Sequence, residues 1–334
     1  MKLSQLHNLL AIVEQGSLRA AARHLGLAQP TLTRSIQELE RELGVSLFER
    51  GQQGITLTAM GQRFINRAQK IDNDARQALD EIRQLQGAGG GTLNVCLSTM
   101  THLAFLPYAL KTFRARYPNV FLDIREGQFR DVEDPLKNGM IDCYIGPSPE
   151  HPVSTALHVE KVLDHRRVIV CRRGHPLAGA RSLRELANAE WITTSVTGKA
   201  QEELGPLFAG HGLPAPRLVM RANTALTFIT SIVSSDLLAM LPVEWTHSEV
   251  TRNLVDSIEI DEVLPAPPLC IAWRASLPLT PAADYFCDLI RRAIAHARPL
   301  AAVRSGIAPV MPLRQPGMAP ARPAAERRVP ALAS

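Results

Sequence analysis

The chain lacks any apolar run near the ~20 residues that a helix needs to cross a bilayer. Its first residues, Met-Lys-Leu-Ser-Gln, also lack the basic-then-apolar build of a signal peptide. Both absences favour a cytoplasmic protein that does not act at a membrane. Cysteine is scarce, since the five cysteines are far apart, odd in number and without CxxC or Cys/His ligand spacing. We therefore expect small buried thiols instead of a disulfide framework or zinc site, with a redox-sensing pair as the alternative.

Motifs of catalysis are also missing. The sequence contains no GxSxG, HExxH or P-loop string. The Gly-rich segment 87–91 comes before an expected strand, whereas a dinucleotide fingerprint needs its glycines after one. We therefore expect no enzyme activity, no cofactor and no metal.

An excess of charge of one sign is nearly absent. Lys and Arg number 37 against 32 Asp and Glu, a net charge of +5 over 334 residues. Residues 298–334 alone hold six arginines against one glutamate, whereas residues 1–60 carry an excess of one basic residue. Net charge is therefore weak evidence for nucleic-acid binding, and the basic excess lies in a Pro/Ala/Arg tail that we expect to be disordered.

Helical patterns open the chain. Residues 4–15 are apolar on one face, and Ser17 is a good N-cap for a second helix over 18–25. A third helix starts at Gln29-Pro30, where proline fits the first turn. Short helices around a tight turn predict a helix-turn-helix. Two β-capable runs around the glycines of 51–54 then predict a hairpin, the wing of a winged helix.

A long helix is predicted over about 59–86, with Thr58 as its N-cap. Its apolar residues alternate between spacings of four and three for about three heptads, which is typical of a coiled-coil seam. Packing against its own domain is the alternative, but the regular spacing favours dimerisation. The seam consists of Phe64, Ala68, Ile71, Ala75, Ala78, Ile82 and Leu85.

Strands and helices alternate in the rest of the chain. Residues 92–145 follow a βαβαβ order, which indicates a mostly parallel sheet covered by helices. The expected elements in this stretch are strand 92–98, helix 106–116, strand 120–125, helix 131–138 and strand 141–145. Further strands are expected near 168–171, 191–194, 217–220, 237–241 and 269–273, with helices near 225–234 and 282–296.

The order of residues adds a more specific signal. It lies in Gly16-Ser17-Leu18-Arg19-Ala20-Ala21-Ala22, Leu25-Gly26-Leu27-Ala28-Gln29-Pro30-Thr31-Leu32-Thr33-Arg34 and Leu47-Phe48-Glu49-Arg50. This segment resembles the DNA-binding domain of LysR-type transcriptional regulators. Leu106-Pro107, Tyr117-Pro118, Glu126-Gly127, Ile141-Asp142 and Arg173-Gly174-His175-Pro176-Leu177 look like the effector domain of the same family. The resemblance covers about residues 1–297.

The resemblance implies an α/β multidomain fold with a two-lobed effector domain like periplasmic binding proteins. It also implies promoter DNA, RNA polymerase and a small-molecule effector as partners, and a homodimer through the linker helix that assembles into a homotetramer. The implied divisions are a winged helix-turn-helix over 1–58, a dimerising linker helix over 59–86, a hinge over 87–91, lobe I over 92–162 and 268–297, lobe II over 163–267, and the tail 298–334.

In such a domain, side chains near the start of the third helix reach base edges in the major groove. Gln29 can make paired hydrogen bonds to adenine, and Thr31 or Thr33 can contact thymine. A solvated helix face is the alternative for these residues. In the wing, Gln52 stands where the family often has a basic residue, which predicts weaker phosphate contact. The full DNA-binding set is Ser17, Gln29, Pro30, Thr31, Thr33, Arg34, Gln37, Arg50 and Gln52.

The effector is expected beyond the carboxyl ends of strands in the two lobes. Hydroxyls and backbone N–H groups at helix N-termini favour an anionic group, and an aromatic anion is the narrower alternative. Ordinary caps and turns remain an alternative for each residue. The expected effector-binding set is Ser98, Thr99, Met100, Thr101, His102, Gln128, Ile145, Gly146, Thr193, Thr194, Asn223 and Thr224.

Two other classes of function stay open. One is a small-molecule sensor whose N-terminal helices bind protein, which the Gln29–Arg34 cluster and the wing argue against. The other is a substrate-binding module for transport, which conflicts with the missing export signal. Salt-dependent, sequence-selective DNA binding by residues 1–90 would separate these classes from a regulator.

Overall fold

A computed structural model describes residues 1–51, 54–87, 90–149, 151–193 and 201–304. Contacts within the chain divide it into two units, Met1–Ala295 and His296–Ser334. The helices and strands of the structure belong to the first unit, except that the last turns of the final helix extend into the second.

Three helices and a hairpin form the N-terminal domain. They are α1 (Leu3–Gln15), α2 (Leu18–His24), α3 (Gln29–Leu43), and the antiparallel pair β1 (Phe48–Gly51) and β2 (Gly54–Leu57). The Ser17 hydroxyl accepts a hydrogen bond from the backbone N of Ala20 at 3.1 Å, so it caps α2. The predicted helix-turn-helix and wing hairpin are therefore confirmed. Their shared core contains Leu6, Leu9, Ile12, Leu32, Ile36, Leu39 and Leu47.

The long helix α4 (Ala59–Leu85) follows, N-capped as predicted by Thr58, whose hydroxyl accepts from the N of Gly61 at 3.0 Å. Its first turns belong to the N-terminal domain, because Ala68 is buried in that domain's core and Phe64 packs against it. The predicted seam is therefore wrong at these two positions, which pack within the chain. Further along, Ile71, Ile82 and Leu85 are exposed.

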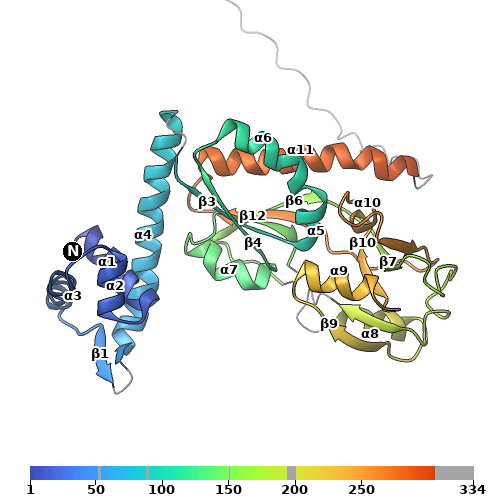
Figure 1. Cartoon of the computed structure of the whole chain (residues 1–334), viewed down its shortest axis with the longest axis horizontal. Coiled ribbons are helices and arrows are strands. Elements are labelled where there is room, and N and C mark those ends of the chain that lie inside the picture. The colour runs from blue at the N-terminus through green and yellow to red at the C-terminus, as the bar shows by residue number, and fades with distance from the viewer. Residues whose placement is uncertain (52–53, 88–89, 150, 194–200, 305–334) are drawn as a thin grey trace, which may run out of the picture. The chain divides into compact units, whose positions relative to one another are not determined.

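A five-stranded sheet forms the core of one α/β lobe. Helices α6 (Leu106–Arg116) and α11 (Pro281–Arg304) cover one face and α7 (Phe129–Lys137) covers the other (Figure 1). The strand order is β4-β3-β5-β12-β6, in which β3 is parallel to β4 and β5, and β12 is antiparallel to β5 and β6. The strands are β3 (Thr92–Leu97), β4 (Phe121–Glu126), β5 (Cys143–Pro147), β6 (Leu157–Leu163) and β12 (Leu269–Arg274).

The other lobe holds two small sheets. Strand β7 (Arg167–Arg172) pairs antiparallel with both β10 (Ala239–Pro242) and β11 (Val255–Ile258). Strands β8 (Glu190–Thr193) and β9 (Arg217–Arg221) form a parallel pair. The helices of this lobe are α8 (Gln201–Gly210), α9 (Ala225–Val233) and α10 (Glu244–His247).

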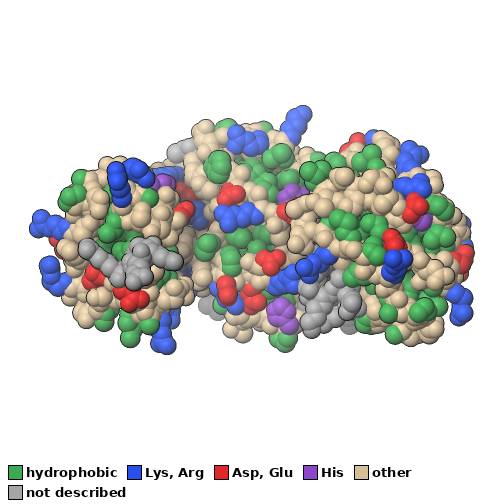
Figure 2. Space-filling model, turned by 60° about the horizontal axis from the view of Figure 1, so that its bottom comes forward, with side chains coloured by type: hydrophobic (Ala, Val, Ile, Leu, Met, Phe, Trp, Pro, Cys, Tyr) green, Lys and Arg blue, Asp and Glu red, His purple; other side chains and the backbone are tan. Residues whose placement is uncertain are grey.

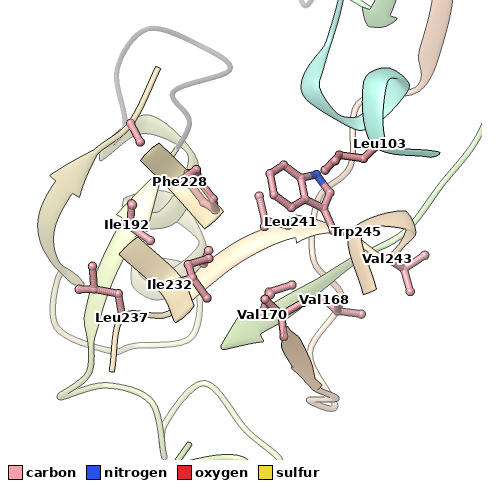
Figure 3. Packing of buried hydrophobic residues seen from close by; sticks show 13 residues of the cluster. Leu103, Val168, Val170, Ile192, Phe228, Ile232, Leu237, Leu241, Val243 and Trp245 are labelled. Carbon is pink, nitrogen blue, oxygen red and sulfur yellow. The ribbon is translucent and has the colours of Figure 1, made fainter. Parts of the chain in front are cut away.

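One apolar cluster joins the two lobes. Phe228 of α9 and Trp245 of α10 are buried in it, with ring centroids 5.4 Å apart. Leu103, from the short helix α5 (Thr99–Ala104) of the five-stranded lobe, packs into the same cluster beside Trp245 (Figure 3). Burying such side chains is worth roughly 1.5–3 kcal/mol each, so this cluster is a main source of cohesion between α5 and the second lobe.

The last helix departs from expectation. Helix α11 continues through Arg304, past its predicted end near residue 296 and into the segment 298–304 that was predicted to be part of the tail. The amphipathic character of α11 explains its length. Phe286, Ile290 and Ile294 are buried at helical spacing and stabilise the helix as far as residue 294, close to the start of segment 298–304. The remainder of the predicted tail, 305–334, lies outside the described residues.

All five cysteines are buried and none is in a disulfide, as expected for small hydrophobes. Hydrogen bonding with Cys287 and burial raise the pKa of Cys143 well above its ordinary value. Oxidation proceeds through the thiolate, so this environment disfavours the redox alternative at that cysteine. Among the helices of the described ranges, none is both long and apolar enough to span a membrane.

Candidate DNA interface and effector site

The exposed face of α3 forms the candidate DNA interface. One face of α3 is buried against α1 and α2 through Leu32, Ile36 and Leu39. The opposite face of α3 therefore points to solvent. A surface groove of about 590 Å³ runs along that outward face. Its lining residues are Gln29, Pro30, Thr33, Arg34, Gln37, Glu38 and Arg41, of which the first five were predicted from sequence.

Arg34 is highly exposed in this groove, with 83% of its side chain accessible. Its Nε lies 3.2 Å from Oε1 of Glu38, one helical turn further along. An exposed pair of this type contributes at most about 1 kcal/mol, so a DNA phosphate can replace Glu38 as the partner of Arg34. Glu38 and Arg41 were not predicted, although they lie four and seven residues after Arg34, on the same face of the helix, and this spacing could have revealed them.

The other predicted DNA residues divide into three groups. Thr31 is exposed, next to the groove, whereas Ser17 is half-buried and its hydroxyl is engaged in capping. Arg50 lies on strand β1, but its side chain is outside the described part of the structure. Gln52 falls in the gap between residues 51 and 54 and is likewise not described.

Glu40 attaches the wing to α3, a role the sequence analysis missed. Its Oε1 accepts hydrogen bonds from the backbone N of Leu47 at 2.7 Å and of Phe48 at 3.1 Å. Bonds to an ionised acceptor are stronger than neutral ones, so the start of the hairpin is fixed to the buried side of the recognition helix. The wing is thereby positioned by the same helix that presents the groove.

The linker helix carries a polar stripe that sequence analysis did not identify. Asn73, Asp80 and Gln84 are buried, and with Gln77 they recur at spacings of four, three and four. This stripe faces the base of the five-stranded lobe. Asn73 donates to the carbonyl of Asn138 at 2.8 Å, Asp80 accepts from the N of Thr92 at 3.2 Å, and Gln84 accepts from the N of Ala282 at 2.9 Å.

Two buried ionic groups complete this junction. Nη1 of Arg274 lies 2.5 Å from Oδ1 of Asp74, and Nη2 of Arg274 donates a hydrogen bond to Oε1 of Gln77 at 3.1 Å. Gln77 also donates to Asp142, which accepts from the N of Asn94 at 2.7 Å. Burial raises the pKa of Asp142, although the hydrogen bond from Asn94 opposes the shift. A buried network whose members are bonded to one another holds the linker helix to the lobe in one geometry.

The predicted effector residues of the first lobe lie where β3 ends. Ser98 and Thr101 are buried, with their hydroxyl oxygens 3.0 Å apart, and Thr101 donates to the carbonyl of Ile145 at 3.0 Å. These two hydroxyls and Ile145 are therefore brought together, but they are engaged with one another. Met100 is buried as well, and Nδ1 of His102 lies 3.1 Å from the carbonyl of Ser98.

Two further predicted residues of this lobe have structural roles. Gln128 is the N-cap of α7 and forms a capping box with Asp131. Gly146 is buried, and an added Cβ there would overlap the phenol ring of Tyr144. The backbone at Gly146 thus approaches the Tyr144 ring too closely for any side chain.

Glu126, at the end of β4, is a polar group that the sequence analysis did not single out. The Thr99 hydroxyl donates to its Oε1, and the backbone N of Ala225, the first residue of α9, lies 3.5 Å from its Oε2. A carboxylate thus lies between a hydroxyl of one lobe and a helix N-terminus of the other. Both donors suit an anion.

The second lobe contributes Thr193, Asn223 and Thr224 near the same edge. Thr193 ends β8 and its carbonyl accepts from the N of Ala222 at 3.0 Å, while Asn223 is exposed. Thr224 caps α9, with its hydroxyl 2.9 Å from that of Thr227. Thr194 lies in the stretch 194–200, outside the described residues.

The charged surface is mixed. On the face shown in Figure 2, Lys and Arg side chains are spread over the view with Asp and Glu side chains among them. The candidate DNA interface is therefore distinguished by the geometry of α3 and the wing, and not by an excess of positive charge on this face. A helix-turn-helix with an exposed polar recognition helix, a long linker helix and two α/β lobes together define a DNA-binding regulator with a ligand-binding domain.

Comparisons with known proteins agree with that class. Residues 3–62 match the bacterial regulatory helix-turn-helix of the lysR family, and residues 86–295 match the LysR substrate-binding domain. The chain belongs to the LysR family of transcriptional regulators. Such proteins are regulators and not enzymes.

Curated relatives span nearly the whole chain. The transcriptional regulator TdcA of Escherichia coli K12 is 23% identical over 280 residues, which are 84% of this chain and 89% of TdcA. The SDS degradation transcriptional activation protein of a Pseudomonas species is 28% identical over 311 residues, 90% of this chain and 99% of that protein.

Solved structures show the same fold. CbnR, a LysR family transcriptional regulator, superposes with a TM-score of 0.63 at 21% identity, covering 88% of this chain and 99% of CbnR. The structure of full-length CbnR with its target DNA gives the same TM-score at 23% identity, covering 88% of this chain and all of that one.

Proposed function

We propose that this regulator recognises its operator through the outward face of α3 and responds to an anionic small molecule bound between the lobes. The observation that supports the first part is the groove of Gln29, Pro30, Thr33, Arg34 and Gln37 on a helix whose other face is buried. We propose the same division of the chain as above: DNA-binding domain, linker helix, hinge, and lobes joined by two connections.

Replacing Gln29 with Ala should lower operator affinity about tenfold or more, because the amide is placed to make paired hydrogen bonds with a base. Binding to unrelated DNA, which depends on phosphate contacts, should change little. The measurement is a gel-shift titration of full-length protein on operator and on scrambled DNA.

Gln86→Ala provides the matched control, since Gln86 is exposed at the far end of α4. It should bind the operator as the unaltered chain does. Equal operator affinity and selectivity of the Gln29 and Gln86 variants would remove Gln29 from the base-reading set.

The environment of Glu126 supports the anionic effector. Its carboxylate already uses the Thr99 hydroxyl and the N-terminus of α9, so these donors accommodate a carboxylate. An effector with a carboxylate or a similar group would take the same donors and displace Glu126. This exchange would change how the lobes are held together, which is the step that links effector binding to DNA contacts.

Calorimetry with a panel of small carboxylic acids and their matched amides tests this assignment. We expect an acid that binds to lose about tenfold in affinity in Thr99→Ala, since a hydrogen bond to a charged group contributes roughly 1.5–3 kcal/mol. The exposed Thr230 of α9 provides the control substitution to Ala. Tighter binding of the amide than of its acid would contradict an anionic effector.

We further propose that the linker helix dimerises. With the polar stripe of α4 bound to the lobe, its other side presents Ile71, Leu79, Ile82 and Leu85, each more than 40% exposed. Ile71, Ile82 and Leu85 belong to the predicted coiled-coil seam, and Leu79 adds to the same side of the helix. Exposed apolar side chains on one side of a helix are costly in water and are covered when a second copy packs against them. Assembly of two such dimers into a tetramer would follow the family pattern.

A further inference from the structure

Two connections join the lobes, and side chains of the first bind the second. The first runs from the end of β6 to β7, and the second from β11 to β12. Nε2 of His165 lies 2.8 Å from the carbonyl oxygen of Pro267, and Nη1 of Arg166 lies 2.9 Å from Oε2 of Glu259. The two connections are thereby held to each other at the point where the lobes would hinge.

The other ring nitrogen of His165 faces Glu244, the first residue of α10. Its Nδ1 lies 4.0 Å from Oε2 of Glu244, and the two side chains are only 2% and 16% exposed. Within the described part of the chain, neither of these atoms has a hydrogen-bond partner. Because Nε2 donates to a carbonyl, a neutral imidazole directs the lone pair of Nδ1 at the carboxyl group.

Two lone-pair atoms that face each other in a buried site require a proton between them. If Glu244 is ionised, its charge is buried opposite a lone pair, which is unfavourable. If Glu244 is protonated, its hydroxyl can donate to Nδ1 after a movement of about 1 Å. Burial raises the pKa of Glu244 to about 7 and lowers that of His165, and both shifts favour the neutral acid and neutral imidazole.

Helix α10 connects this pair to the contact between the lobes. Val243 and Trp245, on either side of Glu244, are buried in the apolar cluster that receives Leu103 of α5 (Figure 3). Ser248, just after α10, donates its hydroxyl to the carbonyl of Leu103 at 2.9 Å. A change at Glu244 therefore acts directly on the segment that packs against α5, whose first residues are candidates for effector binding.

We propose that His165 and Glu244 form a proton-dependent latch at the hinge between the lobes. The proton held between them keeps α10 against the connections, and its loss loosens α10 from α5. The latch makes the geometry of the effector site respond to pH whatever the effector is. The other charged or titratable groups around the pair are Asp164 and Arg166 beside His165, Arg167 on β7, Glu259 paired with Arg166, and His247 on α10.

The sign of the pH dependence follows from the direction of the shift. The pKa of Glu244 in the folded chain, about 7, is above its ordinary value of 4.5. Neutral Glu244 stabilises the folded chain relative to the unfolded chain. This stabilisation is fully present below about pH 4.5 and is lost as the pH rises through about 7. Arg166 opposes this shift, but burial is the larger effect.

Hydrogen exchange of the full-length chain tests the proposal. The variant is Glu244→Gln, which keeps the shape of the acid and cannot ionise. The quantity compared is the fraction of molecules in which the amides of segments 99–104 and 244–248 are open to exchange, after correction for intrinsic exchange. Between pH 6 and pH 8 this fraction should rise about tenfold more in the unaltered chain than in Glu244→Gln. Glu249→Gln, at an exposed position close by, should follow the unaltered chain.

Parallel pH profiles of the unaltered chain and Glu244→Gln would overturn the proposal. A uniform loss of protection in the variant, without a change in pH dependence, would also overturn it, since it would show a purely structural role. A second measurement requires no variant. Infrared difference spectra of the unaltered chain should show a protonated carboxyl band that disappears between pH 6 and pH 8, and its absence would contradict the latch.

Discussion

Replacing Gly61 with Ala should abolish operator binding while leaving the effector lobes folded. Gly61 lies in the first turn of α4, and an added Cβ would overlap the carbonyl oxygen of Leu47 and lie 3.0 Å from Cδ2 of Leu57. The first of these contacts is with backbone, which cannot rotate away. The same carbonyl also accepts from the N of Thr58 at 2.9 Å, so moving it would disturb the cap of α4 and the base of the wing.

We expect this substitution to destabilise the DNA-binding domain by about 3 kcal/mol, at the upper end for overpacking. The measurement is thermal unfolding, with separate transitions followed for the two parts of the chain, together with a gel shift. Gly210→Ala is the matched control, because a Cβ at Gly210, the last residue of α8, meets nothing within 4 Å. Retention of operator affinity in Gly61→Ala would refute the close approach of α4 to Leu47.

Replacing Ile82 with Glu should separate the two chains that we propose are paired through their linker helices. Ile82 is 55% exposed on α4, in the middle of the apolar stripe and away from the polar junction with the lobe. A charge at this position would be buried without a partner in a dimer and well hydrated in a monomer. In a dimer, binding of one recognition helix brings the second helix to its half-site at a high effective concentration. Without this linkage, operator affinity should fall about a hundredfold.

Sedimentation of the full-length protein measures this change directly. Asn66→Glu introduces the same charge at an exposed position of α4 that lies off the stripe, and it should leave the assembly unchanged. A dimer of unaltered stability in Ile82→Glu would mean that α4 is not the dimer contact.

Local signals predicted much of the fold. Ser17 and Thr58 marked helix starts correctly, because capping depends on residues within one turn. The alternation from β3 to β5 was also predictable from the chain order. Strand β6 was missed because it lies at a sheet edge, where charged residues such as Glu160 and Lys161 interrupt the apolar pattern.

Contacts between distant segments were not predictable in the same way. The polar stripe of α4 looks like a solvated face in the sequence, and only its burial against the lobe distinguishes it. Glu126 and Ala225 are 99 residues apart, so no spacing rule places them together. Similarly, the environment of Glu244 arises from the meeting of α10 with the connection that carries His165, and residue order carries no sign of its burial.

Selection of DNA from a random-sequence pool by the full-length chain tests the central claim most directly. A regulator that presents α3 from each half of a dimer should enrich one two-fold related sequence. It should bind that sequence at least about a thousandfold more tightly than scrambled DNA at the same salt concentration. Enrichment of no sequence, or of sequences that Gln29→Ala binds with equal preference, would contradict recognition through α3.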